Sequence, residues 1–230
     1  ETEQGHPLYL VPLRKSCAYE ISDHADVFVG SQELVPATGW DYRQFLQSLA
    51  VNPSMNASML GTQIVGNYAA MSEYGGVGFE TLSAIDLSAL RLTNPGSLPS
   101  ALDNFGSAVL GATTDDWNIL GNYRNRYSNR FGDYRGLSGD EYFPNFLDIG
   151  NLFGAIATDG LLSSTIRSAA EAVYRAGMDA IIANYSNEPG WATGLSIYFS
   201  PGRTTPQTGY DAASLEFAAD TQWDEFLAWW

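Results

Sequence analysis

Cysteine and histidine are the side chains that most directly suggest covalent chemistry, and this sequence contains few of them. Cys17 is the only cysteine, and His6 and His24 are the only histidines. A thiol becomes a nucleophile when a neighbouring base or positive charge lowers its pKa towards neutrality. A single cysteine also excludes an intrachain disulfide and a zinc site built from several cysteines. Cys17 is therefore a catalytic nucleophile, an inert buried thiol or a free surface thiol.

The two histidines are candidate bases, but their surroundings do not favour either of them. His24 follows Asp23 directly and precedes Asp26 by two positions, and we expect it to be a solvated helix residue. His6 precedes Pro7. A general base must lie within hydrogen-bond reach of the proton that it removes. We therefore expect the base of any cysteine-histidine pair to lie outside this sequence.

Acidic residues cluster in segments that we expect to be loops. Asp115-Asp116, Asp133 and Asp140-Glu141 offer the carboxylate oxygens that Ca²⁺ prefers, but they do not follow the spacing of an EF-hand. Solvated loop acids are the simpler interpretation. The sequence itself therefore requires no cofactor and specifies no metal site.

The charge of the whole chain is strongly negative. The sequence has 26 Asp and Glu residues against 11 Lys and Arg residues, which gives a formal net charge of −15. Such a surface repels nucleic acid and anionic membranes, and it attracts cations and basic peptides, although solubility alone can explain it. No run approaches the roughly 20 apolar residues of a membrane-spanning helix, and no signal pattern opens the sequence. We therefore expect a soluble chain, either mature or a fragment, that does not bind nucleic acid.

The candidate residues must be positioned by alternating strands and helices. An apolar run at 8–11 predicts a buried strand, a helical spacing over 16–24 follows it, and 27–31 reads as a second strand, so the chain opens in a βαβ-like manner. The pattern predicts further helices from Asp41 to the stop at Asn52-Pro53, at about 57–74, 99–110, 145–157 and 163–182, and one or two over 210–230, with strands at 79–85 and 194–199. Residues 123–142 lack periodicity, and we interpret them as a long surface loop.

Three blocks, in this order, resemble the clostripain family of cysteine peptidases. The first runs from Ala18-Tyr19-Glu20-Ile21 through 25–33 to Pro36-Ala37-Thr38-Gly39-Trp40-Asp41-Tyr42, and it is similar to the helix, strand and Gly-Trp-Asp-Tyr turn that follow the family's nucleophile. The second is 146–152, which is similar to an Asp-Leu helix start, and the third is 194–199 with Tyr210-Asp211 and 223–227 after it. The resemblance covers about residues 8–230. It implies one domain over 1–230 with a caspase-like α/β fold, in which a mostly parallel sheet is flanked by helices and further helices lie at the C-terminus.

The same resemblance implies a histidine-cysteine dyad and raises a problem of alignment. Counting back from Ala18 without a gap places Leu10 at the nucleophile's position, and leucine cannot attack a carbonyl. A gap instead places Lys15-Ser16-Cys17 where the family has Asp-Ala-Cys. The family's His-Gly motif has no counterpart in this sequence. Relatives mature by cleavage between histidine and cysteine, so we expect this chain to correspond to the heavy chain, with the histidine on a light chain that precedes it.

The resemblance also implies an acidic substrate pocket for the Arg or Lys side chain before the cleaved bond. A carboxylate pairs with a guanidinium through two parallel hydrogen bonds, which gives geometric as well as electrostatic specificity. Asp41 and Glu33 are the candidate carboxylates, and Ser31 belongs to the segment 29–32 that would pair with an extended peptide. The alternative for Asp41 is to cap the helix that begins at Tyr42.

Two functions follow from these observations. The first is an endopeptidase, secreted, cell-surface or periplasmic, that cleaves peptides and proteins after Arg or Lys, with Ca²⁺ as a possible cofactor by family resemblance. The second is a catalytically inactive binding or structural module of an exported protein. The expected partners are a basic peptide or protein substrate and either a companion light chain or a second copy of the chain.

Overall fold

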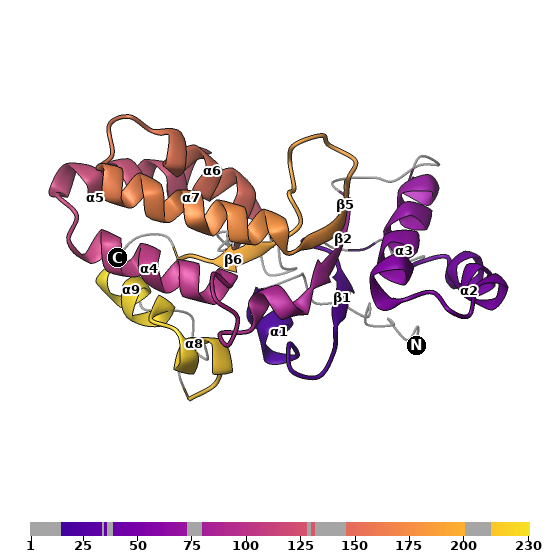
Figure 1. The fold of residues 1–230 in the computed structure, drawn as a ribbon. Coiled ribbons are helices and arrows are strands. Elements are labelled where there is room, and N and C mark those ends of the chain that lie inside the picture. Colours follow the sequence, from indigo (N-terminus) through magenta and orange to yellow (C-terminus); the bar gives the residue numbers. More distant parts are fainter. Residues whose placement is uncertain are drawn as a thin grey trace, which may run out of the picture.

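The computed structural model describes residues 15–33, 35, 39–72, 80–127, 130–131, 146–200 and 213–230. Two small sheets lie near the middle of the molecule, with a helical hairpin at one end and a larger group of helices at the other (Figure 1). The predicted strand at 8–11 lies outside the described residues.

The first sheet contains three strands in the order β1-β2-β5. These are β1 (Val27–Gly30), β2 (Thr81–Asp86) and β5 (Ile181–Ser186), and both pairings are antiparallel. Strand β2 lies in the centre and is buried over its first five residues. The register between β2 and β5 shifts at a bulge between Ala84 and Ile85.

The second sheet has the order β3-β4-β6. It consists of β3 (Arg130–Phe131), β4 (Phe146–Asp148) and β6 (Ser196–Tyr198), again with antiparallel pairings. All residues of β4 and β6 are buried. These short strands therefore lie inside the molecule.

The expectation of a mostly parallel sheet is not met by the described strands, which all pair antiparallel. The connection between β1 and β2 explains the difference there. A single crossover helix returns the chain to the starting end of a sheet and makes the next strand parallel. Here two helices, α2 (Tyr42–Val51) and α3 (Ala57–Ser72), lead out and back, so β2 starts at the end where β1 stopped.

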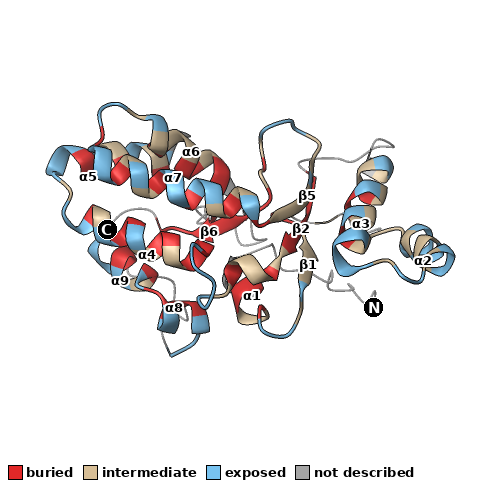
Figure 2. Ribbon diagram, viewed as in Figure 1, coloured by how far each residue is buried: buried red, intermediate tan, exposed pale blue. Residues whose placement is uncertain are grey.

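Helix α3 attaches this hairpin to the first sheet. Val65 and Tyr68 pack with Leu82 and Ala84 of β2 in a small apolar cluster. Helix α2, by contrast, has no buried residue (Figure 2). The hairpin is therefore held by one of its two helices.

The main core lies between the second sheet and the helices at the other end of the molecule. Helix α7 (Ser164–Asp179) packs on α4 (Leu98–Leu110) and α6 (Ile149–Thr158). Phe105 and Phe153 meet edge to face there, with ring centroids 5.0 Å apart. Figure 2 shows the inward faces of these helices as buried.

Chain segments far apart in sequence meet at α1 (Lys15–Glu20) and α8 (Glu216–Asp220). The hydroxyl of Tyr19 donates to Asp220 Oδ2 at 2.8 Å. The carboxylate of Glu20 accepts from the backbone N–H groups of Glu216 and Phe217, each at 3.0 Å, and so caps α8. Helix α1 is thus held in place by residues near the end of the sequence.

Several boundaries differ from the predictions. The helix predicted over 16–24 ends at Glu20 and continues as a turn, and the segment predicted as a helix from 145 begins as β4. The helix predicted over 163–182 ends at Asp179, because Ile181 and Ile182 belong to β5. Helix α5 (Thr114–Asn122) and the short helix η1 (Leu87–Leu90) complete this part of the fold.

The segment predicted as a surface loop begins as a π-helix, η2 (Tyr123–Tyr127), and contains β3. Most of its remaining residues lie outside the described ranges. The aromatic end of the sequence forms helix α9 (Trp223–Trp229). It closes the core with Phe226 and Leu227, each 1% exposed, whereas Trp229 is 69% exposed.

Candidate functional site

The single cysteine is the third residue of α1. His24 lies beyond the other end of this helix, in an exposed turn where its backbone N–H donates to the carbonyl of Ile21 at 3.0 Å. Cys17 therefore lies within α1, whereas His24 lies in the turn that follows the helix. His6 and the side chain of Cys17 lie outside the described part of the structure.

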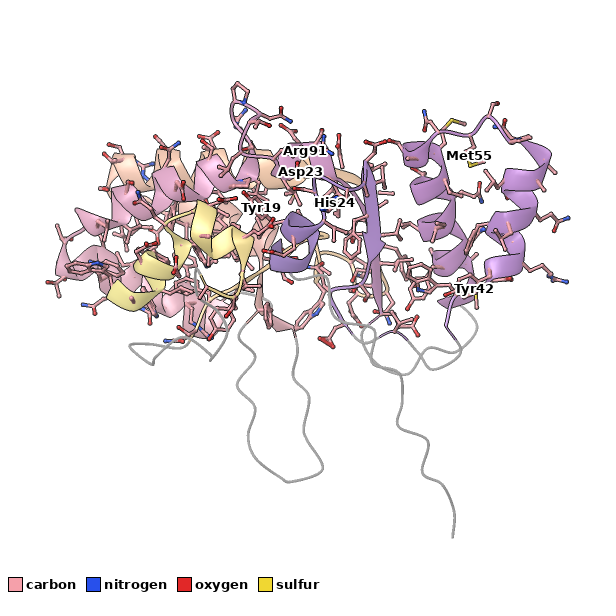
Figure 3. The ribbon with its side chains drawn as sticks, turned by 90° about the horizontal axis from the view of Figure 1, so that it is seen from below. Tyr19, Asp23, His24, Tyr42, Met55 and Arg91 are labelled. Atoms are coloured by element: carbon pink, nitrogen blue, oxygen red, sulfur yellow. The ribbon has the colours of Figure 1, made fainter. Side chains whose placement is uncertain are left out.

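The turn that carries His24 is fixed by an arginine from a distant segment. Arg91 Nε donates to the carbonyl of Ser22 at 2.8 Å and lies 3.4 Å from Asp23 Oδ1. Its terminal nitrogen also donates to the carbonyl of Ala25 at 3.2 Å. Figure 3 shows Asp23, His24 and Arg91 together in this region. These bonds hold the turn, and none of them orients the imidazole towards α1.

The loop after β1 carries two of the predicted substrate-binding residues. Ser31 is buried, and its Oγ lies 2.8 Å from Thr81 Oγ1 at the start of β2. The backbone N–H groups of Gln32 and Glu33 donate to the same threonine oxygen at 3.0 and 3.2 Å. The N–H of Glu33 also donates to Ser31 Oγ at 3.1 Å. Thr81 thus fixes the loop. Glu33, at its end, is half-buried.

A fully buried carboxylate, Asp148, lies beneath this loop. Its Oδ1 accepts from the N–H of Asn151 at 2.8 Å, which caps α6, and from Thr193 Oγ1 at 2.7 Å. Its Oδ2 accepts from the N–H of Thr193 at 2.8 Å and from Gln32 Nε2 at 2.9 Å. Burial raises the pKa of Asp148, and these four hydrogen bonds oppose that rise because they favour the ionised form.

The amide of Gln32 connects the loop to two other segments. While its Nε2 donates to Asp148, its Oε1 accepts from the N–H of Gly194 at 2.9 Å. Gly194 has φ +123°, a conformation that side chains disfavour, and a Cβ there would lie 3.0 Å from Ile181 Cδ1. Gln32 is itself fully buried. We call Gln32, Asp148, Thr193 and Gly194 the buried polar network.

The buried polar network joins the ends of both sheets. Gln32 follows β1, Asp148 ends β4, and Gly194 precedes β6. The sequence patterns pointed to the segments that contain Asp148 and Gly194, and they placed Gln32 in the segment 29–32 expected to pair with a peptide, but they did not predict its buried contacts. A glutamine directly after an apolar strand is a weak signal, because its burial depends on partners that are distant in sequence.

Asp41 caps α2, as the alternative prediction for this residue stated. Its Oδ1 accepts from the N–H of Gln44 at 3.2 Å. The neighbouring rings of Trp40 and Tyr42 stack with centroids 6.3 Å apart. Figure 3 shows Tyr42 at the start of α2 and Met55 beyond its other end. The second carboxylate oxygen of Asp41 can still accept from a guanidinium.

The acidic clusters do not form a metal site in the described part of the chain, where no group of three or more His, Cys, Asp or Glu residues is suitably placed. Asp116 forms a capping box with Thr113 at the start of α5, and the hydrogen bonds from Thr113 lower its pKa. Asp133, Asp140 and Glu141 lie outside the described residues. Among the described helices, none is both long and apolar enough to cross a membrane.

A family profile identifies the family of this chain. The sequence profile of the clostripain family, Peptidase_C11, matches residues 16–230. No curated protein matches the sequence.

Solved structures share the fold at low sequence identity. A clostripain from Bacteroides thetaiotaomicron ATCC 29148, in complex with the peptide inhibitor BTN-VLTK-AOMK, has a TM-score of 0.58 and 13% identity, over 93% of this chain and 82% of that one. A secreted C11 cysteine protease from B. thetaiotaomicron with an irreversible peptide inhibitor has a TM-score of 0.61 and 16% identity, over 92% of this chain. An inactive zymogen C11 protease from Parabacteroides distasonis has a TM-score of 0.56 and 14% identity, over 93% of this chain. Our chain spans only 56% and 55% of the latter two.

Proposed function

Because the chain belongs to the clostripain family of peptidases, we propose that it is a cysteine endopeptidase that cleaves after Arg or Lys, with Cys17 as its nucleophile. The observation that carries this proposal is the extent of the family match, which begins at residue 16 and so includes the only cysteine. Cys17 lies in α1, directly before the buried residues Ala18 and Tyr19 that attach this helix to the core. A nucleophile on such an element would have a fixed position.

The reaction needs a base as well as a thiol. In the proposed step the base takes the thiol proton, sulfur bonds to the substrate carbonyl carbon, and the C–N bond breaks as the amine leaves with that proton. Water then hydrolyses the thioester. His24 lies beyond the C-terminal end of α1, in an exposed turn, whereas Cys17 lies within the helix. We therefore propose that a companion light chain supplies the histidine.

We propose that Glu33 and Asp41 recognise the basic side chain of the substrate. Glu33 belongs to the loop that Thr81 and the buried polar network fix, which supports a role that needs a rigid position. Ser31 belongs to the same loop and would help place the peptide backbone. The net charge of −15 favours basic peptides. The inhibitor BTN-VLTK-AOMK bound by one relative contains the peptide VLTK, whose last residue is lysine, which is consistent with this preference.

The proposal extends to location and cofactor. One structural relative is a secreted protease, and we propose a secreted, cell-surface or periplasmic location for this protein. Ca²⁺ remains a proposal from the family alone. A homo-oligomer is the alternative to a companion chain.

The test combines thiol labelling with peptide cleavage. The chain, alone and together with its companion chain, is treated with iodoacetamide at neutral pH and assayed on a fluorogenic Arg-amide peptide, with and without Ca²⁺. We expect rapid alkylation of Cys17 that abolishes cleavage. We also expect no turnover by Cys17→Ala, whose unfolding midpoint should match that of the unmodified protein. Turnover by Cys17→Ala would refute the assignment of the nucleophile.

Substrate recognition is tested separately. Glu33→Gln and Asp41→Asn should raise KM for Arg and Lys peptides about tenfold, which corresponds to the loss of one charge-assisted contact. Peptides with a neutral residue before the cleaved bond should be cleaved at the same slow rate by the unmodified protein and by both variants. Equal losses on both kinds of peptide would mean that the two carboxylates do not read the basic side chain.

A specific observation favours a second function, an inactive binding module. The ungapped alignment places Leu10 where the family has its nucleophile. In that case a basic peptide would bind, and Glu33→Gln would weaken binding, but Cys17 would react slowly and no turnover would occur. The same two assays therefore distinguish the two functions.

A further inference from the structure

A pocket of about 660 Å³ lies at the end of the molecule formed by α5 and α9. This end is distant from β1 and the α2–α3 hairpin, on which the proposed substrate residues lie (Figure 1). The volume falls within the range of about 300–1,000 Å³ that small-ligand sites occupy. The pocket has no role in the proposed peptidase reaction.

Three of the six tryptophans in the sequence line this pocket: Trp117, Trp229 and Trp230. The ring of Trp117 stacks on Phe226 at an interplanar angle of 14° and lies 5.5 Å from the ring of Trp230. These contacts fix two indole rings at the pocket. Trp229 is 69% exposed, which leaves a large apolar ring in water unless a ligand covers it.

Besides the tryptophans, the pocket is lined by Leu110, Gly121 and uncharged polar residues. Asn118 and Asn122 lie one helical turn apart on α5, and both are exposed. Each side-chain amide offers two donors and one acceptor oxygen. None of the described residues that line the pocket has a charged side chain, although the chain as a whole has 26 acidic residues.

This combination selects a chemical class of ligand. Sugar hydroxyls both donate and accept hydrogen bonds and so match asparagine amides, while the C–H face of a sugar ring packs on an indole ring. A basic peptide would need carboxylate side chains in the pocket, and an acidic ligand would need cationic ones, but no side chain of the described lining is of either kind. We propose that this pocket binds a neutral oligosaccharide.

The test is direct binding to the unmodified protein. The probes are cellotetraose, maltotetraose and chitotetraose, followed by isothermal calorimetry and by the NMR signals of the tryptophan indole N–H groups. We expect a dissociation constant of about 1 mM or lower for at least one probe. The indole signals of the three pocket tryptophans should shift, and those of the other three should not.

Variants locate the site. Trp229→Ala should weaken binding at least about tenfold, and its exposed position means that the fold should survive. The double variant Asn118→Ala with Asn122→Ala tests the pocket independently of any tryptophan. Tyr42→Ala, which removes a 58% exposed ring from α2, is the matched control and should bind as the unmodified protein does.

Three outcomes would overturn the proposal. The first is that no probe shifts an indole signal at about 10 mM, the second is that Trp229→Ala and the double asparagine variant both retain full binding, and the third is that Tyr42→Ala weakens binding equally. Cleavage of the Arg-amide peptide should be the same with and without bound sugar, so failure here and failure of the peptidase proposal are distinguishable.

Discussion

Replacing Asp148 by alanine should destabilise the protein far more than replacing Asp41, although both aspartates cap a helix through the N–H three residues ahead. Asp41 makes this one bond at a partly exposed position, so Asp41→Ala should cost about 1 kcal/mol, as is usual for a helix cap. Asp148 is fully buried and accepts three further hydrogen bonds, from Gln32 and twice from Thr193.

The expected cost follows from the donors that the substitution leaves behind. Asp148→Ala leaves Nε2 of the buried Gln32 and the N–H of the half-buried Thr193 without their acceptor, and an unsatisfied buried donor costs about 1–3 kcal/mol. Two such donors together with the lost cap lead us to expect a cost of about 3–5 kcal/mol. Domains are stable by about 5–15 kcal/mol, so the variant should still fold.

Urea unfolding followed by circular dichroism measures both variants. The midpoints give the difference in the free energy of unfolding, provided that the m-value is unchanged. Gln32→Met preserves the approximate volume of the side chain but removes its bonds to Asp148 and Gly194. The variant that combines Asp148→Ala with Gln32→Met should lose less free energy of unfolding than the sum of the two single losses, because both changes break the same network. If Asp148→Ala costs no more than Asp41→Ala, our account of the buried polar network is wrong.

Two further predictions concern α9 and α3. The pKa of Asp224 is raised to about 6, mainly by burial and further by a hydrogen bond to Glu225 and repulsion from its charge. Because the folded protein holds this proton more tightly than the unfolded chain, the free energy of unfolding should fall as the pH rises from about 4 through 6. Glu225→Gln should lower the midpoint of the Asp224 carboxyl in an NMR titration and weaken the dependence of the free energy of unfolding on pH. An unchanged midpoint would contradict the role of Glu225. In α3, Gly61→Ala should cost about 1–3 kcal/mol because its Cβ would lie 3.0 Å from the Cβ of buried Ala84, whereas Gly66→Ala, with open space around it, should stabilise by about 0.5–1 kcal/mol in thermal unfolding.

Local patterns in the sequence predicted the isolated elements well. The helical spacing after Asp41 and the stop at Asn52-Pro53 enclose α2, and the apolar run before Ser31 corresponds to β1. The family resemblance is confirmed by the profile match. These features are predictable because caps, breakers and periodicity act over a few residues.

Features that depend on distant partners were not predictable in the same way. The isoleucines at the start of β5 continue the spacing of α7, and only pairing with β2 makes them a strand. The antiparallel direction of β2 relative to β1 depends on how the α2–α3 hairpin returns the chain. No local sequence pattern predicts that path. Burial of Gln32 likewise depends on Asp148 and Gly194, which lie more than a hundred positions later.

The contact between α1 and α8 has a consequence for how the protein folds during synthesis. Tyr19 and Glu20 bond to residues 196 to 201 positions later in the sequence. Contacts of such long range are formed late, since the loop between them must first be closed. Helix α1, which carries Cys17, therefore cannot form these contacts until the ribosome has synthesised α8. Until then the apolar face of α1 must be protected from association with other chains.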